Sequence, residues 1–232
     1  MTAWRSIRKN IEKMDATFVL AISGGIDSMV LLDFFHRSKA KFTVAHFNHK
    51  LQPINEDMEK LVVDYCVSNN IPYYVGTGAN IEHISKIMNT SIEAEARRQR
   101  YDFLAEIAKI VHFLDNKDAI IVTAHHQDDQ VETVLLNLFR GVGLQSVYIK
   151  ELSNKVFRPF LEIPKSELIH SAQGRRIPWV EDPTNAENDA DRNWLRNELI
   201  PQIMARRNIS KTIPLSISKF EDYIQGLNQL TK

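Results

Sequence analysis

Residues 18–28, FVLAISGGIDS, join an apolar run to a glycine-rich turn that contains an acid and two hydroxyls. Five apolar residues in a row, ended by Ser-Gly-Gly, are typical of a buried strand that stops in a tight turn. The two glycines let the backbone bend sharply and approach a ligand closely. Residues 28–37 then favour a helix, whose N-terminus carries a partial positive charge. This order of elements predicts a phosphate-binding loop formed by Ser23, Gly24, Gly25, Ile26, Asp27 and Ser28.

The same turn has a simpler interpretation, in which Gly24 and Gly25 serve only the geometry of a strand-to-helix connection. It is not a Walker A loop, because the Lys-Ser/Thr ending is missing, and it is not Gly-x-Gly-x-x-Gly. Asp27 would repel phosphates unless a cation lay between them. Its presence therefore predicts Mg²⁺ held between Asp27 and the phosphates, and a helix N-cap is the alternative role for this acid.

Short apolar runs alternate with longer helix-period segments on both sides of the loop. We predict strands at residues 18–22, 42–45, 72–75 and 119–124, and helices at 28–37, 55–69, 91–114 and 128–139. Strands separated by helices predict an α/β fold, doubly wound around a mainly parallel sheet.

The alternation weakens after about residue 143. We expect a hairpin or irregular strands at residues 147–162 and helices at 164–173, 189–205 and 214–229. The chain is therefore divided into a core at residues 1–143 and a smaller, mostly helical C-terminal extension at residues 144–232.

Composition excludes several classes of protein. The 232 residues have a formal net charge of zero, so nucleic-acid binding has to come from local basic patches. Cys66 is the only cysteine, which excludes an intramolecular disulfide and metal sites built from several thiolates. No apolar run approaches the ~20 residues of a membrane span, and residues 1–15 are too polar for a signal peptide. These features predict a cytoplasmic protein.

Polar strings follow the second and fourth predicted strands. Both lie at the carboxyl edge of the expected sheet, where open parallel sheets bind ligands. His46 and Asn48 share one face of their strand. Contact with bound ATP and satisfaction of loop backbone groups are equally open roles for these two side chains.

The second string, HHQDDQVET at residues 125–133, is too polar for core packing. Metal binding is one interpretation. We favour recognition of a cationic amine substrate by carboxylates, with a histidine as base. The candidates for binding such an amine are Asp128, Asp129 and Glu132, and those for catalysis include His125 and Asp129.

Arginines supply candidate phosphate contacts. Arg97 shares a helix face with Glu93 and Arg100, so a surface ion pair is the alternative to a substrate contact. Arg140 closes the helix after the histidine string. In the extension, tryptophans accompany four arginines that we predict to contact nucleic acid, with solvated surface charge as the alternative. These are Arg175, Arg176, Arg192 and Arg196.

The glycine loop resembles the PP-loop of the N-type ATP pyrophosphatases, whose fold is adenine nucleotide alpha hydrolase-like. Together with further strings, it resembles the tRNA(Ile)-lysidine synthetase family from about residue 18 to residue 201. The matching strings lie at residues 23–28, 46–49, 95–101, 125–133, 140–143, 158–159, 182–185 and 192–196. The chain is similar to a short form of that family, without the large C-terminal domains.

The resemblance implies ATP and Mg²⁺ as cofactors and a C–N bond-forming ligase. Such an enzyme joins free L-lysine to C2 of the wobble cytidine of an isoleucine tRNA with the anticodon CAU. The cytidine is first adenylated with release of pyrophosphate, and AMP leaves when lysine adds. The same resemblance implies that Asp27 holds the metal, that Arg97 contacts phosphate or substrate, and that His125 and Asp129 serve lysine and catalysis. The resemblance implies no membrane partner, and it is compatible with a homodimer.

Two other functions compete with this one. A different PP-loop adenylating enzyme, of the tRNA thiolation or amidation type, would share the loop, although Cys66 alone does not supply paired cysteines. A non-catalytic nucleotide- or RNA-binding relic is the second alternative. The intact loop and the acids of residues 125–133 favour an enzyme over the relic.

Overall fold

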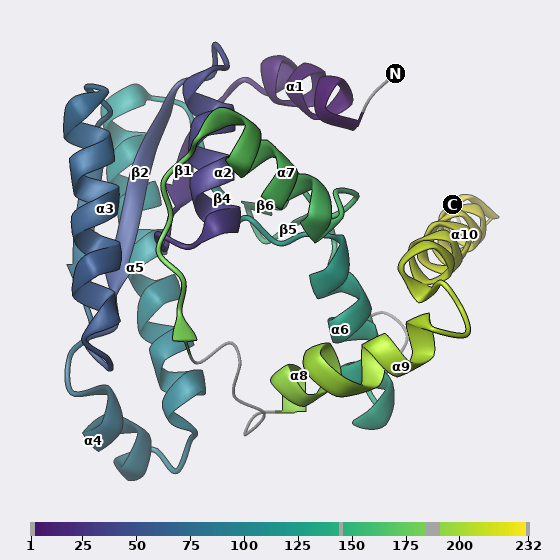
Figure 1. The fold of residues 1–232 in the computed structure, drawn as a ribbon. Helices are drawn as coiled ribbons and strands as arrows, with labels where there is room; N and C mark the ends of the chain where they lie inside the picture. The colour runs from purple at the N-terminus through teal and green to yellow at the C-terminus, as the bar shows by residue number, and fades with distance from the viewer. Residues whose placement is uncertain (1–2, 144–145, 184–190, 231–232) are drawn as a thin grey trace. The chain divides into compact units, whose positions relative to one another are not determined.

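A six-stranded sheet organises the chain, as the alternating pattern predicts (Figure 1). The computed structural model describes residues 3–143, 146–183 and 191–230. The strand order is β3-β2-β1-β4-β6-β5, in which only β5 is antiparallel to its neighbour. The strands are β1 (Ala16–Ala21), β2 (Phe42–Asn48), β3 (Tyr73–Thr77), β4 (Asp118–Val122), β5 (Leu152–Ser153) and β6 (Val156–Phe157). The prediction of a mainly parallel α/β sheet is confirmed.

Helices cover both faces of this sheet because the side chains of each strand alternate between the faces. On one face Val19 of β1 belongs to a core that includes Leu104 and Val111 of α5 (Ile92–Asp115). On the other face Phe18 meets Phe35 of α2 (Ile26–His36), with ring centroids 5.3 Å apart. Burial of both faces is what defines the doubly wound arrangement.

Most predicted helices are present with boundaries shifted by one or two residues. They include α3 (Ile54–Ser68), which buries Cys66, and α5, whose N-cap Ser91 accepts a hydrogen bond from Ala94 N at 3.1 Å. Burial raises the pKa of the Cys66 thiol to about 11. Two helices were not predicted, namely α1 (Ala3–Lys13) and α4 (Ile81–Ile87). Each of these helices buries two residues.

The C-terminal part is mostly helical, as predicted. Helix α6 (Gln127–Phe139) still belongs to the predicted core. The helices that follow it are α7 (Lys165–Arg175), α8 (Asp191–Trp194), α9 (Ile200–Met204) and α10 (Ile209–Leu230). A π-helical turn, Leu195–Leu199, joins α8 to α9. The start of the helix predicted at residue 189 lies outside the described residues. None of the described helices has the length and hydropathy needed to cross a membrane.

The chain packs as two compact units, which are described separately. Unit 1 contains the sheet and comprises Met1–Ala124, Leu152–Pro159 and Ser166–Asp182. Unit 2 comprises His125–Glu151, Phe160–Lys165 and Pro183–Lys232. The division at residue 143 remains a prediction.

Candidate functional site

The predicted phosphate loop lies between β1 and α2 in unit 1 and is held by its own hydroxyls. Ser28 Oγ donates to Gly25 O at 2.8 Å and accepts the N–H groups of Ser23 and Gly24 at 3.2 and 3.1 Å. Ser23 Oγ lies 3.1 Å from Ser28 Oγ, within hydrogen-bonding distance. The two hydroxyls therefore shape the turn, and their predicted contact with phosphate remains a prediction.

The two glycines of the loop differ in what they require. Gly24 has a φ of 97°, and a Cβ there would lie 3.0 Å from Met58 Cβ and 3.1 Å from the Met58 backbone. Gly25 has an ordinary φ of −75°, and its nearest neighbour would be Ser23 Oγ at 3.7 Å. Gly24 is therefore needed for packing against α3, whereas the space beside Gly25 is open.

Asp27 lies in the first turn of α2, and Gly25 is the N-cap residue of that helix. The structure therefore does not support the alternative in which Asp27 is the N-cap. The first turn of a helix presents N–H groups that have no acceptor within the helix, and its dipole favours anions. Phosphate binding at this loop would rest mainly on that turn, because two loop N–H groups are already bound by Ser28.

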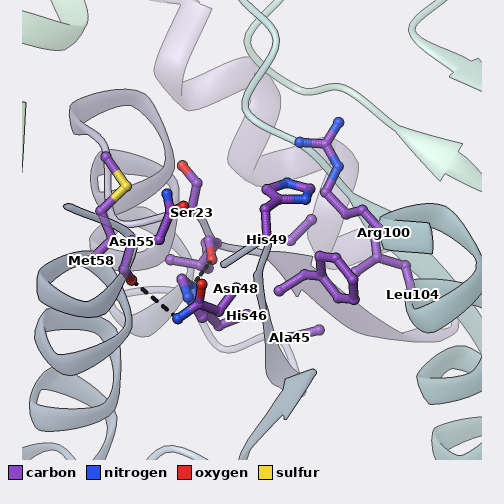
Figure 2. Close-up of a pocket in the computed structure, with 12 residues that line it drawn as sticks. Ser23, Ala45, His46, Asn48, His49, Asn55, Met58, Arg100 and Leu104 are labelled. Carbon is purple, nitrogen blue, oxygen red and sulfur yellow. Dashed lines mark hydrogen bonds between the residues drawn. The ribbon is translucent and has the colours of Figure 1, made fainter. Parts of the chain in front are cut away.

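A pocket opens beside the loop, between the ends of β1 and β2 and helices α3 and α5 (Figure 2). Its lining includes Ser23, His46, Asn48, Met58 and Arg100. Asn48 is engaged within the protein: its Nδ2 donates to Glu59 at 2.6 Å, and its Oδ1 accepts Lys50 N at 2.8 Å. These contacts favour the structural role for Asn48.

His46 retains a hydrogen-bonding atom for a ligand. Its Nδ1 lies 2.8 Å from Ile22 O, an atom that can only accept, so Nδ1 carries the proton. Burial lowers the pKa of His46, which keeps the ring neutral. Nε2 is therefore an acceptor, and it is buried without a partner among the described residues. A donor group on a bound molecule would satisfy it.

His49 lies beside Arg100 at the same pocket. Burial, the charge of Arg100 and the neighbouring His46 lower the pKa of His49 to about 4. Burial also lowers the pKa of the Arg100 guanidinium. Arg100 was not among the predicted site residues, although its place on the face of Arg97 was visible in the spacing.

Arginines gather around Tyr101 on α5. The guanidinium carbons of Arg97 and Arg100 lie 4.9 and 5.5 Å from the Tyr101 ring centroid. Burial lowers the pKa of Arg158 in the same region, and the neighbouring Tyr101 opposes this shift. Three guanidinium groups at one tyrosine form a positively charged region suited to a phosphate.

Other members of the same string hold the helix in place. Buried Glu95 accepts from Arg98 Nη2 at 2.6 Å, and Arg98 also binds Asp102 at 2.6 Å. Gln99 exchanges hydrogen bonds with the backbone of Ala79 at 2.9 and 3.0 Å. Hydrogen bonds from Arg98 and then from Gln99, whose Nε2 donates to Glu95 Oε1 at 2.8 Å, lower the pKa of Glu95 to about 2. Glu95, Arg98 and Gln99 therefore have structural contacts, whereas Arg97 and Arg100 form the positively charged region.

In unit 2, two of the predicted lysine ligands bind arginines. Glu132, which is 1% exposed, accepts Arg192 Nε at 2.7 Å and Arg196 Nε at 2.6 Å. Asp129 lies 3.2 Å from Arg192 Nη2 and 3.7 Å from Arg196 Nη2. The sequence placed these arginines with tRNA, whereas the structure places them on the carboxylates. A role toward tRNA remains a prediction.

Two acids of this string, at the start of α6, also accept hydrogen bonds from backbone N–H groups. Asp129 Oδ2 accepts His126 N at 2.9 Å, and Asp128 Oδ1 accepts Lys165 N at 3.1 Å at the start of α7. Burial acts to raise the pKa of Asp129, but His126, His125, the His126 N–H and Arg192 lower it. Asp128 has a structural contact, so lysine binding on it remains a prediction.

The remaining predicted residues are dispersed. Arg140 lies 3.2 Å from Asp191 in unit 2, and its phosphate contact remains a prediction. Arg175 ends α7 in unit 1, and Arg176 follows the helix with a φ of 55°. Thr184 and Asn185 of the matching string lie outside the described residues. Within the described part of the chain, no group of three or more His, Cys, Asp or Glu side chains could hold a metal ion.

Solved structures with this fold include a tRNA thiolase and an NMN synthetase. The U34-tRNA thiolase NcsA of Methanococcus maripaludis aligns with 94% of this chain and 78% of its own, at a TM-score of 0.67 and 17% identity. The NMN synthetase of Francisella tularensis aligns with 76% of this chain and 70% of its own, at a TM-score of 0.53 and 13% identity. At these identities the likeness concerns the fold alone.

Curated relatives are more similar in sequence. The tRNA(Ile)-lysidine synthase of Enterococcus faecalis is 36% identical over 80% of this chain, and that of Haemophilus ducreyi is 34% identical over 81%. The chain spans 40% and 42% of the length of these two relatives, and 63% of a synthase from Chlorobaculum tepidum that is 36% identical over 91% of this chain. A protein-family model described as "PP-loop domain" matches residues 2–203. With that match spanning most of the sequence, the chain belongs to the PP-loop domain family.

Proposed function

We propose that the protein uses ATP to adenylate the wobble cytidine of an isoleucine tRNA with the anticodon CAU and then joins lysine to C2 of that base. The observation that carries the proposal is the glycine loop at the end of β1, beside a pocket with a buried, unpartnered acceptor on His46. The family match and the named relatives support the same chemistry.

ATP is proposed to bind with its phosphates at the first turn of α2. The open space at Gly25 admits an oxygen close to the backbone, and Nε2 of His46 accepts a donor group of the nucleoside. Asp27 offers the carboxylate that a magnesium ion takes alongside phosphate oxygens. Bound there, Mg²⁺ would neutralise charge on the departing pyrophosphate. Arg97 and Arg100 are proposed to face the α-phosphate.

The first step of the proposed reaction forms one P–O bond and breaks another. The C2 carbonyl oxygen of the cytidine attacks the α-phosphorus, and pyrophosphate leaves with the electron pair. Guanidinium groups stabilise the charge that develops on the phosphorus oxygens. Arg97 and Arg100 have this role in our proposal, since Tyr101 orients both.

Lysine is proposed to bind at the acids and arginines of unit 2. A free amino acid carries both signs of charge, and Asp129 and Glu132 beside Arg192 and Arg196 offer both signs in return. The ε-amine, once neutral, attacks C2, and AMP leaves with the C–O electron pair. The proton released from nitrogen passes to a base, for which His125 is our candidate.

The proposal is tested by incubating the protein with ATP, Mg²⁺, labelled lysine and the CAU-anticodon isoleucine tRNA transcript. We expect label in the tRNA, release of pyrophosphate, and no label in a transcript whose wobble cytidine is replaced by uridine. An Asp27→Asn variant should lose pyrophosphate release while keeping its circular dichroism spectrum. Pyrophosphate release without lysine transfer would point to a different adenylating enzyme. A protein that binds ATP but releases no pyrophosphate would contradict both.

A further inference from the structure

A second basic region lies in unit 1, in a groove between α1, α2 and α7. Arg5 and Arg8 line it from α1, Arg37 from the end of α2, and Arg175 from the end of α7. Trp4 and Phe34 form part of its wall, with ring centroids 5.7 Å apart. Of these residues, only Arg175 is among the arginines that the sequence predicts to contact tRNA, and the function proposed above assigns a role to none of them.

The groove carries a local excess of positive charge. Arg37 Nη2 lies 2.8 Å from Asp33, and Arg175 Nε lies 3.9 Å from the same oxygen, so two guanidinium groups share one carboxylate. The second acid, Glu167, accepts the Trp4 indole N–H at 3.1 Å. Arg5 and Arg8 form no ion pair with any residue that the structure describes. Four arginines thus face two acids on a chain whose formal net charge is zero.

The position of the groove excludes the nucleotide of the phosphate loop as its ligand. Arg37 follows the C-terminus of α2, whereas the loop precedes its N-terminus. Eleven helical residues separate the two ends, which is a distance of roughly 16 Å. Figure 1 shows α1 near the end of the sheet at which the chain enters its parallel strands. A ligand that contacts both the phosphate loop and the groove has to be long.

We propose that this arginine groove binds the sugar-phosphate backbone of the tRNA, at a part of the molecule remote from the reacting base. The inference rests on the proposed function, which supplies a long polyanion as substrate. Guanidinium groups bind phosphates bidentately, and backbone contacts position a nucleic acid without reading its sequence. A protein partner is less favoured, because Phe34 is 3% exposed and so offers almost no apolar surface to an interface core.

Gly174 provides a test that leaves the arginines intact. It lies on α7 in the wall of the groove, and a Cβ added there would meet no atom within 4 Å. Gly174→Glu and Gly174→Gln have nearly the same size and differ by one charge. Gly226 on α10 is an equally open helix glycine outside the groove, so Gly226→Glu controls for the added charge alone.

Binding of the tRNA transcript is measured by fluorescence anisotropy at several salt concentrations. We expect Gly174→Glu to bind about tenfold more weakly than Gly174→Gln, with a salt slope reduced by about one. Gly226→Glu should bind like the unaltered chain, and ATP affinity should be equal in all variants. Equal tRNA affinity and salt slope for the two Gly174 variants would overturn the proposal.

The outcomes separate this inference from the proposed function. If the unaltered chain transfers no lysine but the two Gly174 variants still differ in tRNA binding, the groove stands and the ligase assignment fails. If lysine is transferred and the variants bind equally, the reverse holds. If polyglutamate displaces the tRNA as well as an RNA of equal charge does, the groove takes any polyanion and its assignment to RNA is wrong.

Discussion

At the scale of single residues, the two glycines of the phosphate loop have different tasks. Gly24 combines a left-handed backbone with close contact to Met58, whereas Gly25 has neither constraint. We expect Gly24→Ala to lower the free energy of unfolding by about 2 kcal/mol or more, and Gly25→Ala to change it by less than about 1 kcal/mol.

Urea denaturation checks this difference in stability, and ATP titration of the same variants checks the role of Gly25. A methyl group at position 25 would occupy space that we assign to phosphate, so ATP affinity should fall while the fold is kept. Equal stability of the two variants would contradict the packing argument for Gly24. Unchanged ATP affinity of Gly25→Ala would contradict the assignment of the space.

His49 links the pocket to pH. Its pKa is lowered to about 4 in the folded chain, so the unfolded chain binds a proton near pH 6.5 while the folded chain does not. The contribution of this residue to stability is therefore complete above pH 6.5 and is lost as the pH falls toward 4. His46 has the same direction of shift.

The measurement is the free energy of unfolding by urea at pH 7.5, 6.0 and 5.0. A His49→Gln variant should lose less stability than the unaltered chain over this range, by up to about 1.4 kcal/mol per pH unit. Taking the difference between the two proteins removes the titration of other groups. If both proteins lose the same free energy of unfolding as the pH falls, the pKa of His49 is not lowered in the folded chain.

At the scale of elements, Glu132 ties α6 to α8 and the following π-helical turn. It accepts both Arg192 and Arg196, and the two arginines are 36% and 38% exposed at their side chains. Removing the acid leaves two partly buried cations without their main partner. We expect Glu132→Gln to lower the free energy of unfolding by about 2 kcal/mol, less than for a fully buried pair because water screens both arginines.

A double-mutant cycle with Arg192→Gln isolates the pair from other effects of each substitution. The coupling measured by urea denaturation should be about 1 kcal/mol or more, since Nε of Arg192 binds Glu132 directly. In the lysine-transfer assay, Glu132→Gln should raise the KM for lysine more than it changes the KM for ATP. Additive stability effects would mean that the contact contributes little.

The sequence predicts the elements around the loop well because their signals are local. The apolar run before Ser23 and the period of the helix at residues 91–114 do not depend on distant partners. Helix α1 was not predicted, although Trp4, Ile7 and Ile11 recur at helical spacing and give it a marked apolar face. Its packing partners come from α2 and α7, which no local pattern reveals.

The site is predictable to a similar extent. Charged strings identify which residues are chemically active, but spacing does not say which of them bind each other. The contact of Arg192 and Arg196 with Glu132 joins positions 60 and 64 residues apart, so periodicity cannot find it. Likewise, the engagement of Ser28 with the loop backbone needs coordinates.

At the scale of the whole molecule, the proposed chemistry is distributed over both compact units. The phosphate loop, the pocket and the arginine groove belong to unit 1, and the lysine candidates belong to unit 2. Unit 1 is itself assembled from three separate stretches of chain. The residues that we assign to the proposed reaction are therefore spread widely along the sequence.

The single thiol of the chain follows from the packing of α3. Cys66 is fully buried, and the pKa of its thiol is about 11, so at neutral pH it is both shielded and protonated. Alkylating probes will consequently not react with the native protein, and they will modify Cys66 only when the packing around α3 opens. Cysteines introduced at Gly174 and Gly226, one in each unit, can thus carry a pair of dyes on an unmodified background.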